Sequence, residues 1–305
     1  MLHEFALEPA LIRNWDRFQY YMSNFGIQLG RMISRFPKKW EQLVIGGLAD
    51  CGDVEKKKIV EALIRGRNRL FPRYHEWDPS LSWLANAELE HAKRPFHAVI
   101  AAANSNGRDF VLEESALDAT YPPLLWSATT PRLIERSGLK MAEAIRILLQ
   151  MSKTVLFIDR NFGPKDKGFR LGLQAFLLAM LNRHNQCQAN RIEYHTGDLV
   201  HPADFKDLCN SYLPEIIPSG VRIRFVRWRH GELHDRYIVT EHGGASFAQG
   251  LDEAGETEQP DQLVALIDRA LANQMLQNFT GRPPKFTLID EDVVVIGKRN
   301  VVSTP

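Results

Sequence analysis

The chain has 305 residues, a formal net charge of +1, and 44% hydrophobic and 25% charged residues, which is typical of a folded globular protein with room for two domains. No apolar run approaches the roughly 20 residues needed to cross a bilayer, and the first residues lack the apolar core of a signal peptide. The three cysteines are widely spaced and form neither a disulfide framework nor a CxxC metal knuckle, so we expect a cytoplasmic protein.

The charges are unevenly distributed along the chain. Residues 1–75 contain 13 Lys and Arg against 8 Asp and Glu, whereas residues 76–130 contain 3 against 8. Residues 131–305 are nearly balanced, with 22 against 21. A basic amino-terminal part suits nucleic acid or an acidic protein partner, and it suits the acidic middle of the same chain equally well.

Residues 1–128 predict a mostly helical N-terminal domain. Apolar side chains recur at three- and four-residue spacing in residues 8–26 and 53–71. Residues 96–114 hold two apolar runs on either side of Asn-Ser-Asn-Gly, which predicts a small β-hairpin. The Pro- and Thr-rich residues 119–131 form the candidate linker. We expect this domain to dock a protein partner or nucleic acid.

Residues 129–305 alternate between helical and strand-like patterns. We expect helices at residues 130–153, 169–184, 202–216 and 260–276, and strands at 154–159, 190–197, 221–228, 233–241 and 286–297. This alternation indicates an α/β sandwich with a mixed, mainly parallel sheet. Only one copy of this unit is present in the chain.

The candidate site lies in residues 222–244, where two histidines four residues apart stand among five arginines. If residues 234–241 form a strand, His234 and Arg236 share one face and suit a phosphodiester: Arg holds the oxygens, and His attacks phosphorus or moves a proton. Glu241 is then the candidate to orient the imidazole or its symmetry mate through a hydrogen bond. Further candidates for attracting the phosphate are Arg227, Arg229 and His230. The simpler interpretation, polar side chains at a solvated strand end, stays open.

The pattern His-x-Arg-x4-Glu at His234, Arg236 and Glu241 resembles the His-x-Lys-x4-Asp motif of the phospholipase D-like superfamily. The strand-like run ending at Asp159 and the Gly-Leu-Asp sequence ending at Asp252 also match that superfamily, and the resemblance makes Asp159 and Asp252 candidate substrate-binding residues. The similarity covers about residues 131–305. It is strongest to the phospholipase D-like C-terminal domain of MIT-domain proteins. Arg and Glu replace the usual Lys and Asp, which changes the geometry of the motif.

The resemblance implies a metal-independent phosphodiesterase with no cofactor, most simply a nuclease. One histidine attacks phosphorus, and a second protonates the leaving oxygen. Because the chain holds one motif, we expect a homodimer in which His234 of each subunit contributes. Analogy with other stand-alone domains suggests an effector of a bacterial defence or restriction system. The alternative is a catalytically inactive module that binds nucleic acid or another phosphate ligand within a larger complex.

Two other patterns were weighed as sites. The sequence His-Gly-Glu-Leu-His at residues 230–234 has the wrong spacing for the HExxH zinc signature, so we expect no metal. Tyr194, His195 and Asp198 fall at a predicted strand end, where α/β proteins often bind ligands. We interpret them as ordinary polar residues at the end of a strand.

Overall fold

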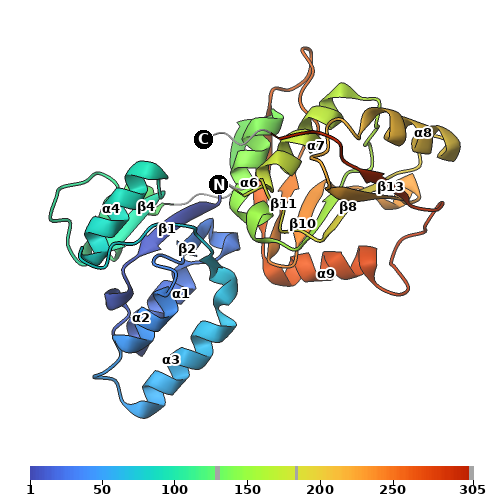
Figure 1. The fold of residues 1–305 in the computed structure, drawn as a ribbon. Helices are drawn as coiled ribbons and strands as arrows, with labels where there is room; N and C mark the ends of the chain where they lie inside the picture. The colour runs from blue at the N-terminus through green and yellow to red at the C-terminus, as the bar shows by residue number, and fades with distance from the viewer. Residues whose placement is uncertain (128–130, 183–184, 302–305) are drawn as a thin grey trace. The chain divides into compact units, whose positions relative to one another are not determined.

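The computed structural model describes residues 1–127, 131–182 and 185–301. The chain divides into two compact units, Met1–Thr129 and Thr130–Pro305 (Figure 1). The domain boundary expected between residues 128 and 129 lies outside the described residues, as does the end of the expected linker. Each unit has its own sheet and its own hydrophobic core.

Unit 1 is built on a five-stranded parallel sheet in the order β3-β2-β1-β4-β5. Its strands are β1 His3–Leu7, β2 Arg31–Ser34, β3 Leu70–Phe71, β4 Ala98–Ala101 and β5 Val111–Glu113. Its helices are α1 Trp15–Asn24, α2 Trp40–Gly46, α3 Asp53–Arg65, α4 Trp83–Lys93 and α5 Glu114–Leu117, with 3-10 turns at Pro9–Leu11, Ile27–Leu29, Arg67–Arg69 and Leu124–Trp126. The helices α1, α2 and α3 share one core with one face of β1, and α4 packs on the other face.

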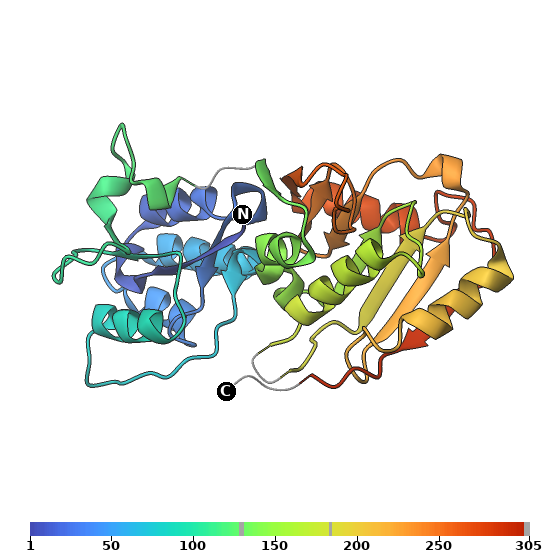
Figure 2. The ribbon, with the colours of Figure 1, turned by 90° about the horizontal axis from the view of Figure 1, so that it is seen from above.

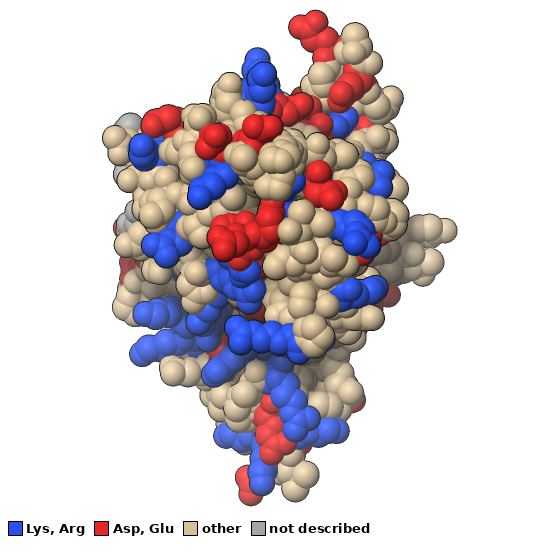
Figure 3. Space-filling view, turned by 90° about the vertical axis from the view of Figure 1, so that its right-hand side faces the viewer, with Lys and Arg blue, Asp and Glu red and all other residues tan. Residues whose placement is uncertain are grey.

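The prediction of a mostly helical domain is therefore wrong, because it leaves out the five-stranded sheet. Strands β1, β2 and β4 are short and buried almost throughout. A short apolar run buried on both faces lacks the alternation that marks a half-exposed strand, so periodicity did not reveal it. Unit 1 as a whole carries no net charge, with 16 Lys and Arg against 16 Asp and Glu, and α3 holds four of the basic residues and three of the acidic ones. Figure 3 shows Lys and Arg side chains gathered in the lower part of the face that it draws, at the height of α3 in Figure 1.

The predicted β-hairpin at residues 96–114 is also wrong, because β4 and β5 pair in parallel. The Asn-Ser-Asn-Gly turn itself is present: the Gly107 N–H donates to the Asn104 carbonyl, and Gly107 has a φ of 59°. This turn sits inside the longer connection formed by residues 102–110, which carries the chain back to the other end of the sheet. A turn signal identifies a reversal but not the length of the loop around it.

Unit 2 holds an eight-stranded mixed sheet in the order β13-β9-β8-β7-β10-β11-β12-β6. Its strands are β6 Arg132–Glu135, β7 Thr154–Ile158, β8 Arg191–Thr196, β9 Arg222–Arg227, β10 Tyr237–Thr240, β11 Gly243–Phe247, β12 Asp261–Ile267 and β13 Val293–Ile296. Its helices are α6 Gly138–Met151, α7 Lys167–Ala179, α8 Pro202–Tyr212 and α9 Arg269–Thr280, with a 3-10 turn at His230–Glu232. The expected mixed α/β architecture is confirmed.

Helices cover both faces of this sheet. Phe176 of α7 packs on Phe157 of β7, and Phe205 of α8 packs on Phe225 of β9. The opposite face, which includes Leu156, Val226 and Val239, packs against α9. Figure 2 shows α7 and α8 running alongside the central strands.

Parallel pairing is confined to β7, β8 and β9, so less of the sheet is parallel than expected. The two expected helices at residues 130–153 and 260–276 each begin as a strand, β6 and β12, and these strands pair with each other in antiparallel fashion. Along β12 the exposed Leu263 lies between the buried Gln262 and Val264, which is the alternation of a strand. The sequence pattern did not reveal this strand, because the helical pattern of α9 follows it directly.

Candidate functional site

One edge of the sheet in unit 2 collects most of the residues expected at a site. The carboxyl ends of the parallel strands β7, β8 and β9 lie at the same edge. Strand β10 is antiparallel to β7 and therefore begins there, and β11 is antiparallel to β10 and ends there. Ligands of open α/β sheets bind outside such carboxyl ends. We call this edge, with the loops that follow β7, β8, β9 and β11 and precede β10, the candidate site.

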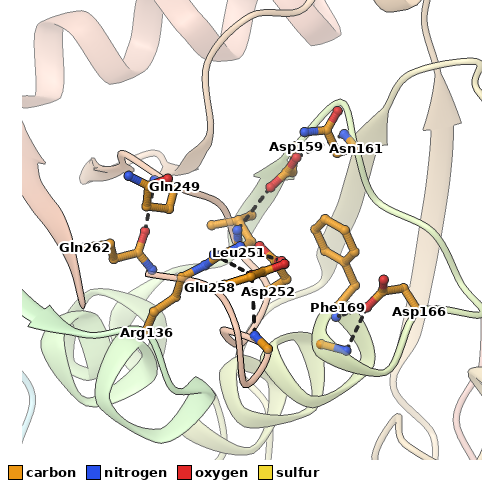
Figure 4. A network of polar contacts seen from close by, with 12 residues as sticks. Arg136, Asp159, Asn161, Asp166, Phe169, Gln249, Leu251, Asp252, Glu258 and Gln262 are labelled. Carbon is orange, nitrogen blue, oxygen red and sulfur yellow. Dashed lines mark hydrogen bonds and ion pairs between the residues drawn. The ribbon is translucent and has the colours of Figure 1, made fainter. Parts of the chain in front are cut away.

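Asp159 follows β7 directly and is fully buried. One carboxylate oxygen accepts from the Asn161 N–H at 3.0 Å, and the other accepts from the Leu251 N–H at 3.0 Å. Burial raises the pKa of Asp159, against the opposing effect of these two hydrogen bonds and of the positive charge of Arg236. Asp159 thus joins the loop after β7 to the loop after β11, as Figure 4 shows.

Arg236 is half-buried in the extended segment before β10. Its charge acts on Asp159, although no ion pair within 4 Å joins them among the described residues. Its buried Nε has no hydrogen-bond partner in the described part of the chain. A guanidinium with unused donors can take a phosphate oxygen, which is the role expected from the sequence.

Asp252 occupies a different role from the one expected. Its carboxylate accepts from the Arg136 guanidinium at 2.6 Å, and Arg136 also donates to Glu258 at 2.8 Å (Figure 4). Arg136 is 9% exposed, so the pair is largely withdrawn from solvent. Asp252 therefore fixes the loop after β11 and has one oxygen committed to Arg136. The sequence analysis missed Arg136, because nothing in the local pattern of β6 signals a partner more than a hundred residues away.

The loop from Gly250 to Asp252 lies in close contact with helix α7. A Cβ added at Gly172 would lie 2.1 Å from the Leu251 carbonyl oxygen, and one added at Gly168 would lie 2.8 Å from the Glu253 carbonyl oxygen. Gly250 itself has a φ of 157°, and its Cβ would meet Asp252 at 2.2 Å. The glycines of α7 hence allow the backbone approach that holds Leu251 against Asp159.

His234 is exposed and lies two residues before Arg236, in the loop that leads into β10. The guanidinium of Arg160, which follows Asp159, donates to the carbonyl of the adjacent Leu233 at 3.3 Å. The Arg160 carbonyl accepts from the Gly197 N–H at 3.1 Å. Arg160 therefore connects the ends of β7 and β8 to the histidine loop. It is a second contributor that the sequence analysis missed.

A cavity of about 280 Å³ lies beside His234. Aromatic and apolar side chains form most of its wall, including Tyr237, Leu271, Met275, Phe279 and Phe286. Its polar lining consists of Lys285, Asn278 and His234 together with the two acids Glu232 and Asp235. Lys285 also stands over the Phe286 ring, 5.6 Å from the centroid. The space suits a flat apolar group that carries polar edges.

His230 lies in the same loop and is held through its backbone. Its N–H donates to Asp198 at 2.9 Å, and its Nδ1 is buried with no hydrogen-bond partner in the described ranges. A Cβ at Gly197 would lie 2.5 Å from that Nδ1, so this glycine makes room for the imidazole. Arg229 is exposed, and its guanidinium lies 3.8 Å from Glu232. Both residues reach the candidate site, at its rim.

Two expected site residues are engaged elsewhere. Arg227 is 1% exposed, forms an ion pair with Asp290 at 2.7 Å, donates to the Val200 carbonyl and stacks on Phe205. It is a packing residue, and burial leaves it no access to a ligand phosphate. The sequence held one indication of this burial: Arg227 is the last residue of a strand and has an apolar neighbour on each side.

Glu241 lies at the opposite end of β10 from His234. Its carboxylate accepts from the backbone N–H groups of Lys153 at 2.6 Å and Thr154 at 3.0 Å, at the start of β7. Seven residues of extended chain, at about 3.3 Å each, separate it from His234. Glu241 therefore does not orient the imidazole of His234 in the same chain. The eight-residue motif spans the whole strand, and the acid secures its far end.

His195 belongs to a buried cluster rather than to a polar strand end. Its Nδ1 accepts from Trp228 Nε1 at 2.9 Å, and its Nε2 lies 3.2 Å from Glu193. Burial lowers the pKa of His195, although Glu193 acts in the opposite direction. Burial would raise the pKa of Glu193, but hydrogen bonds with His195 and Arg191 outweigh it and lower that pKa to about 2. Asp198 holds the backbone of His230, as described above.

No family model and no curated protein matches the sequence. Among solved structures, the chain is similar to the phospholipase D family member Nuc from Salmonella typhimurium, with a TM-score of 0.35 and 12% identity over 53% of this chain and 99% of that one. It is also similar to TrmBL2, described as an archaeal chromatin protein with a novel mode of DNA binding, with a TM-score of 0.29 and 8% identity over 57% of this chain and 58% of that one. Within the described residues, no helix is long and apolar enough to cross a membrane.

Proposed function

We propose that unit 2 is a phospholipase D-like phosphodiesterase domain, and that the protein is a nuclease acting without a metal ion. The observation that carries the proposal is the placement of His234 and Arg236. An exposed imidazole and a guanidinium with unused donors stand two residues apart, where three parallel strands end and β10 begins. This combines a nucleophile with an anion-binding group at the usual ligand edge of an α/β sheet.

The chemistry assigned to these residues has two steps. An imidazole nitrogen of His234 attacks phosphorus, the bond to the leaving oxygen breaks, and a second imidazole donates a proton to that oxygen. That second imidazole then takes a proton from water, whose oxygen displaces the histidine from phosphorus. Arg236 stabilises charge on the equatorial oxygens. The second imidazole is His234 of another copy, related by a two-fold axis.

The cavity beside His234 favours nucleic acid as the substrate. Its aromatic wall can stack a base, while Lys285 and Asn278 can meet polar base edges or a neighbouring phosphate. A base held there stands next to the phosphate that His234 attacks. Lys56–Lys58 of α3 in unit 1 are the proposed contact for the rest of the strand or for an acidic protein partner. The suggested role in bacterial defence rests on analogy and needs a cellular assay.

The test is cleavage of labelled single- and double-stranded DNA and RNA in excess EDTA. We expect the wild-type protein to cleave at least one of them and His234→Ala to lose that activity. His242→Ala is the matched control, because His242 is also in unit 2 but lies in the turn between β10 and β11, at the opposite end of β10 from His234 and outside the candidate site. Equal cleavage by wild type and His234→Ala would overturn the nuclease proposal.

A second candidate function is a non-catalytic module that binds nucleic acid or another phosphate ligand. It is favoured by the engagement of Asp252 with Arg136 and of Glu241 with the start of β7, which leaves fewer side chains for chemistry. Salt-sensitive binding of nucleic acid by a protein that cleaves none of the four substrates would support this function. Arg236→Ala would then weaken binding, whereas His234→Ala would have a small effect.

A further inference from the structure

Unit 1 contains a second cavity that the proposed function does not use. It has a volume of about 730 Å³, within the range of small-molecule sites. Its walls come from the residues after β2 and those after β3. These two strands are parallel neighbours, so the cavity opens at the carboxyl edge of the sheet, where α/β folds bind ligands. The lining residues are Arg35, Pro37, Lys38, Lys39, Leu43 and Pro72–His75 with Trp77.

The side of the cavity formed after β2 is positively charged. Lys38 and Lys39 are exposed, and neither ammonium has an ion-pair or hydrogen-bond partner among the described residues. Arg35 is paired with Glu41 at 2.7 Å, and Arg67 lies 3.7 Å from the same carboxylate, so one acid serves two guanidinium groups. In the described part of the chain no Asp or Glu lines the cavity. An anionic group is therefore favoured there.

The side formed after β3 is aromatic and apolar. Tyr74 is 49% exposed, and Trp77 stands partly buried with its ring 5.5 Å from that of Phe36. Leu43, across the cavity on α2, is 44% exposed. Aromatic and aliphatic surfaces of this kind take the flat face of a heterocycle. One cavity thus offers free cations on one side and stacking surface on the other.

The two sides are held together in one arrangement. His75 Nδ1 lies 2.9 Å from the Arg73 carbonyl, which requires a proton on that nitrogen, so Nε2 accepts from the Lys38 N–H at 3.1 Å. The Arg73 guanidinium is buried and paired with Glu4 at 2.8 Å and Glu90 at 2.7 Å. The loop that carries the lysines and the loop that carries the aromatic residues are hence fixed relative to each other before any ligand binds.

We propose that this cavity binds a nucleoside phosphate, with its phosphates at Lys38 and Lys39 and its base against Tyr74, Trp77 and Leu43. The ligand is either a free nucleotide or one nucleotide of a nucleic acid strand. The site belongs to unit 1 and does not depend on the activity of unit 2.

Isothermal titration calorimetry of the full chain tests the proposal with ATP, GTP, adenosine and inorganic triphosphate. We expect at least one nucleotide to bind more tightly than adenosine or triphosphate, because only a nucleotide uses both sides. The double variant Lys38→Ala/Lys39→Ala should weaken nucleotide binding by roughly tenfold or more, since each charged hydrogen bond contributes about that factor. Leu43→Trp fills the apolar side of the cavity, so it should weaken nucleotide binding without removing a charge.

The matched control is Lys56→Ala/Lys57→Ala on α3, which removes two neighbouring lysines of the same unit and should leave binding unchanged. His234→Ala should also bind as wild type does. Displacement of the bound nucleotide by a short single-stranded DNA would identify a strand as the source of the ligand; failure to displace it would identify a free nucleotide. Triphosphate binding as tightly as any nucleotide, or no binding of either nucleotide, would overturn the proposal.

Discussion

At the scale of single residues, three polar side chains buried beneath the candidate site have specific hydrogen-bond partners. Asp159 receives two backbone N–H groups, Asp252 receives Arg136, and His195 stands between Trp228 and Glu193. An unmatched buried polar group costs about 1–3 kcal/mol, so each pair constrains the residues around it. His195 is the member of this set whose ordinary pKa, 6.5, lies nearest to neutral pH.

The free energy of unfolding should therefore decrease as the pH falls from 7 to 5. The pKa of His195 in the folded protein is lowered from 6.5 by burial, so the unfolded chain takes up its proton first on acidification. Stability is lost as the pH drops below 6.5 toward the folded pKa, by at most about 1.4 kcal/mol per pH unit for this group. Urea unfolding followed by circular dichroism at several pH values measures the slope.

His195→Gln isolates this contribution. Glutamine can place an amide N–H near the position of Nε2 for Glu193 but has no acceptor at the position of Nδ1, to which Trp228 donates. We therefore expect a loss of about 1–3 kcal/mol at pH 7 and a shallower dependence on pH. The other histidines with lowered pKa, His91 and His242, remain in both proteins and cancel in the difference. His201→Gln, at an exposed position, should keep the wild-type slope. Parallel curves for wild type and His195→Gln would contradict the assignment.

At the scale of elements, the packing of α7 against the loop after β11 shapes the candidate site. Gly172→Ala should destabilise unit 2 by about 1–3 kcal/mol, because its Cβ would meet the Leu251 carbonyl oxygen at 2.1 Å and force the loop away. Replacing Gly by Ala inside an exposed helix normally stabilises a protein by up to about 1 kcal/mol. A loss of stability in Gly172→Ala would therefore point to the close contact with the loop. Thermal unfolding measures the change.

Gly231→Ala is the control for that variant, because a Cβ there has no heavy atom within 4 Å. Its effect should be small. Moving Leu251 also removes a hydrogen bond from Asp159, so we expect Gly172→Ala to lower any cleavage as well as stability. Unchanged stability in Gly172→Ala would show that the loop accommodates a side chain and that its contact with α7 is not tight.

At the scale of the whole molecule, the proposed chemistry needs two copies of the chain, and mixing subunits tests this. In an equimolar mixture of wild type and His234→Ala with free exchange, about a quarter of the dimers carry two intact histidines. Cleavage should then fall to about a quarter of that of wild type at the same total concentration. A fall to about a half would show that each subunit acts alone, with His230 as the nearest other imidazole in the loop.

The sequence by itself determined the features that depend on local pattern. Helices α1, α3, α7 and α8, the strands β7 to β9 and the presence of one histidine motif followed from periodicity and composition, because neighbours along the chain produce these signals. The mixed α/β class followed from their order. The strand expected at residues 233–241 is present as β10, but it begins at Tyr237, so His234 and Arg236 lie in the segment just before it.

The tertiary structure alone decided which of those residues meet. Strands β1, β2, β6 and β12 became visible only through their partners, since a short strand is stabilised by hydrogen bonds to distant segments. Arg136 reaches Asp252, and Glu241 caps β7, through contacts between residues about ninety or more positions apart. The cavity in unit 1 likewise joins two loops that only parallel pairing brings together. Local sequence carries no record of such distances, because they are set by how the sheet orders its strands.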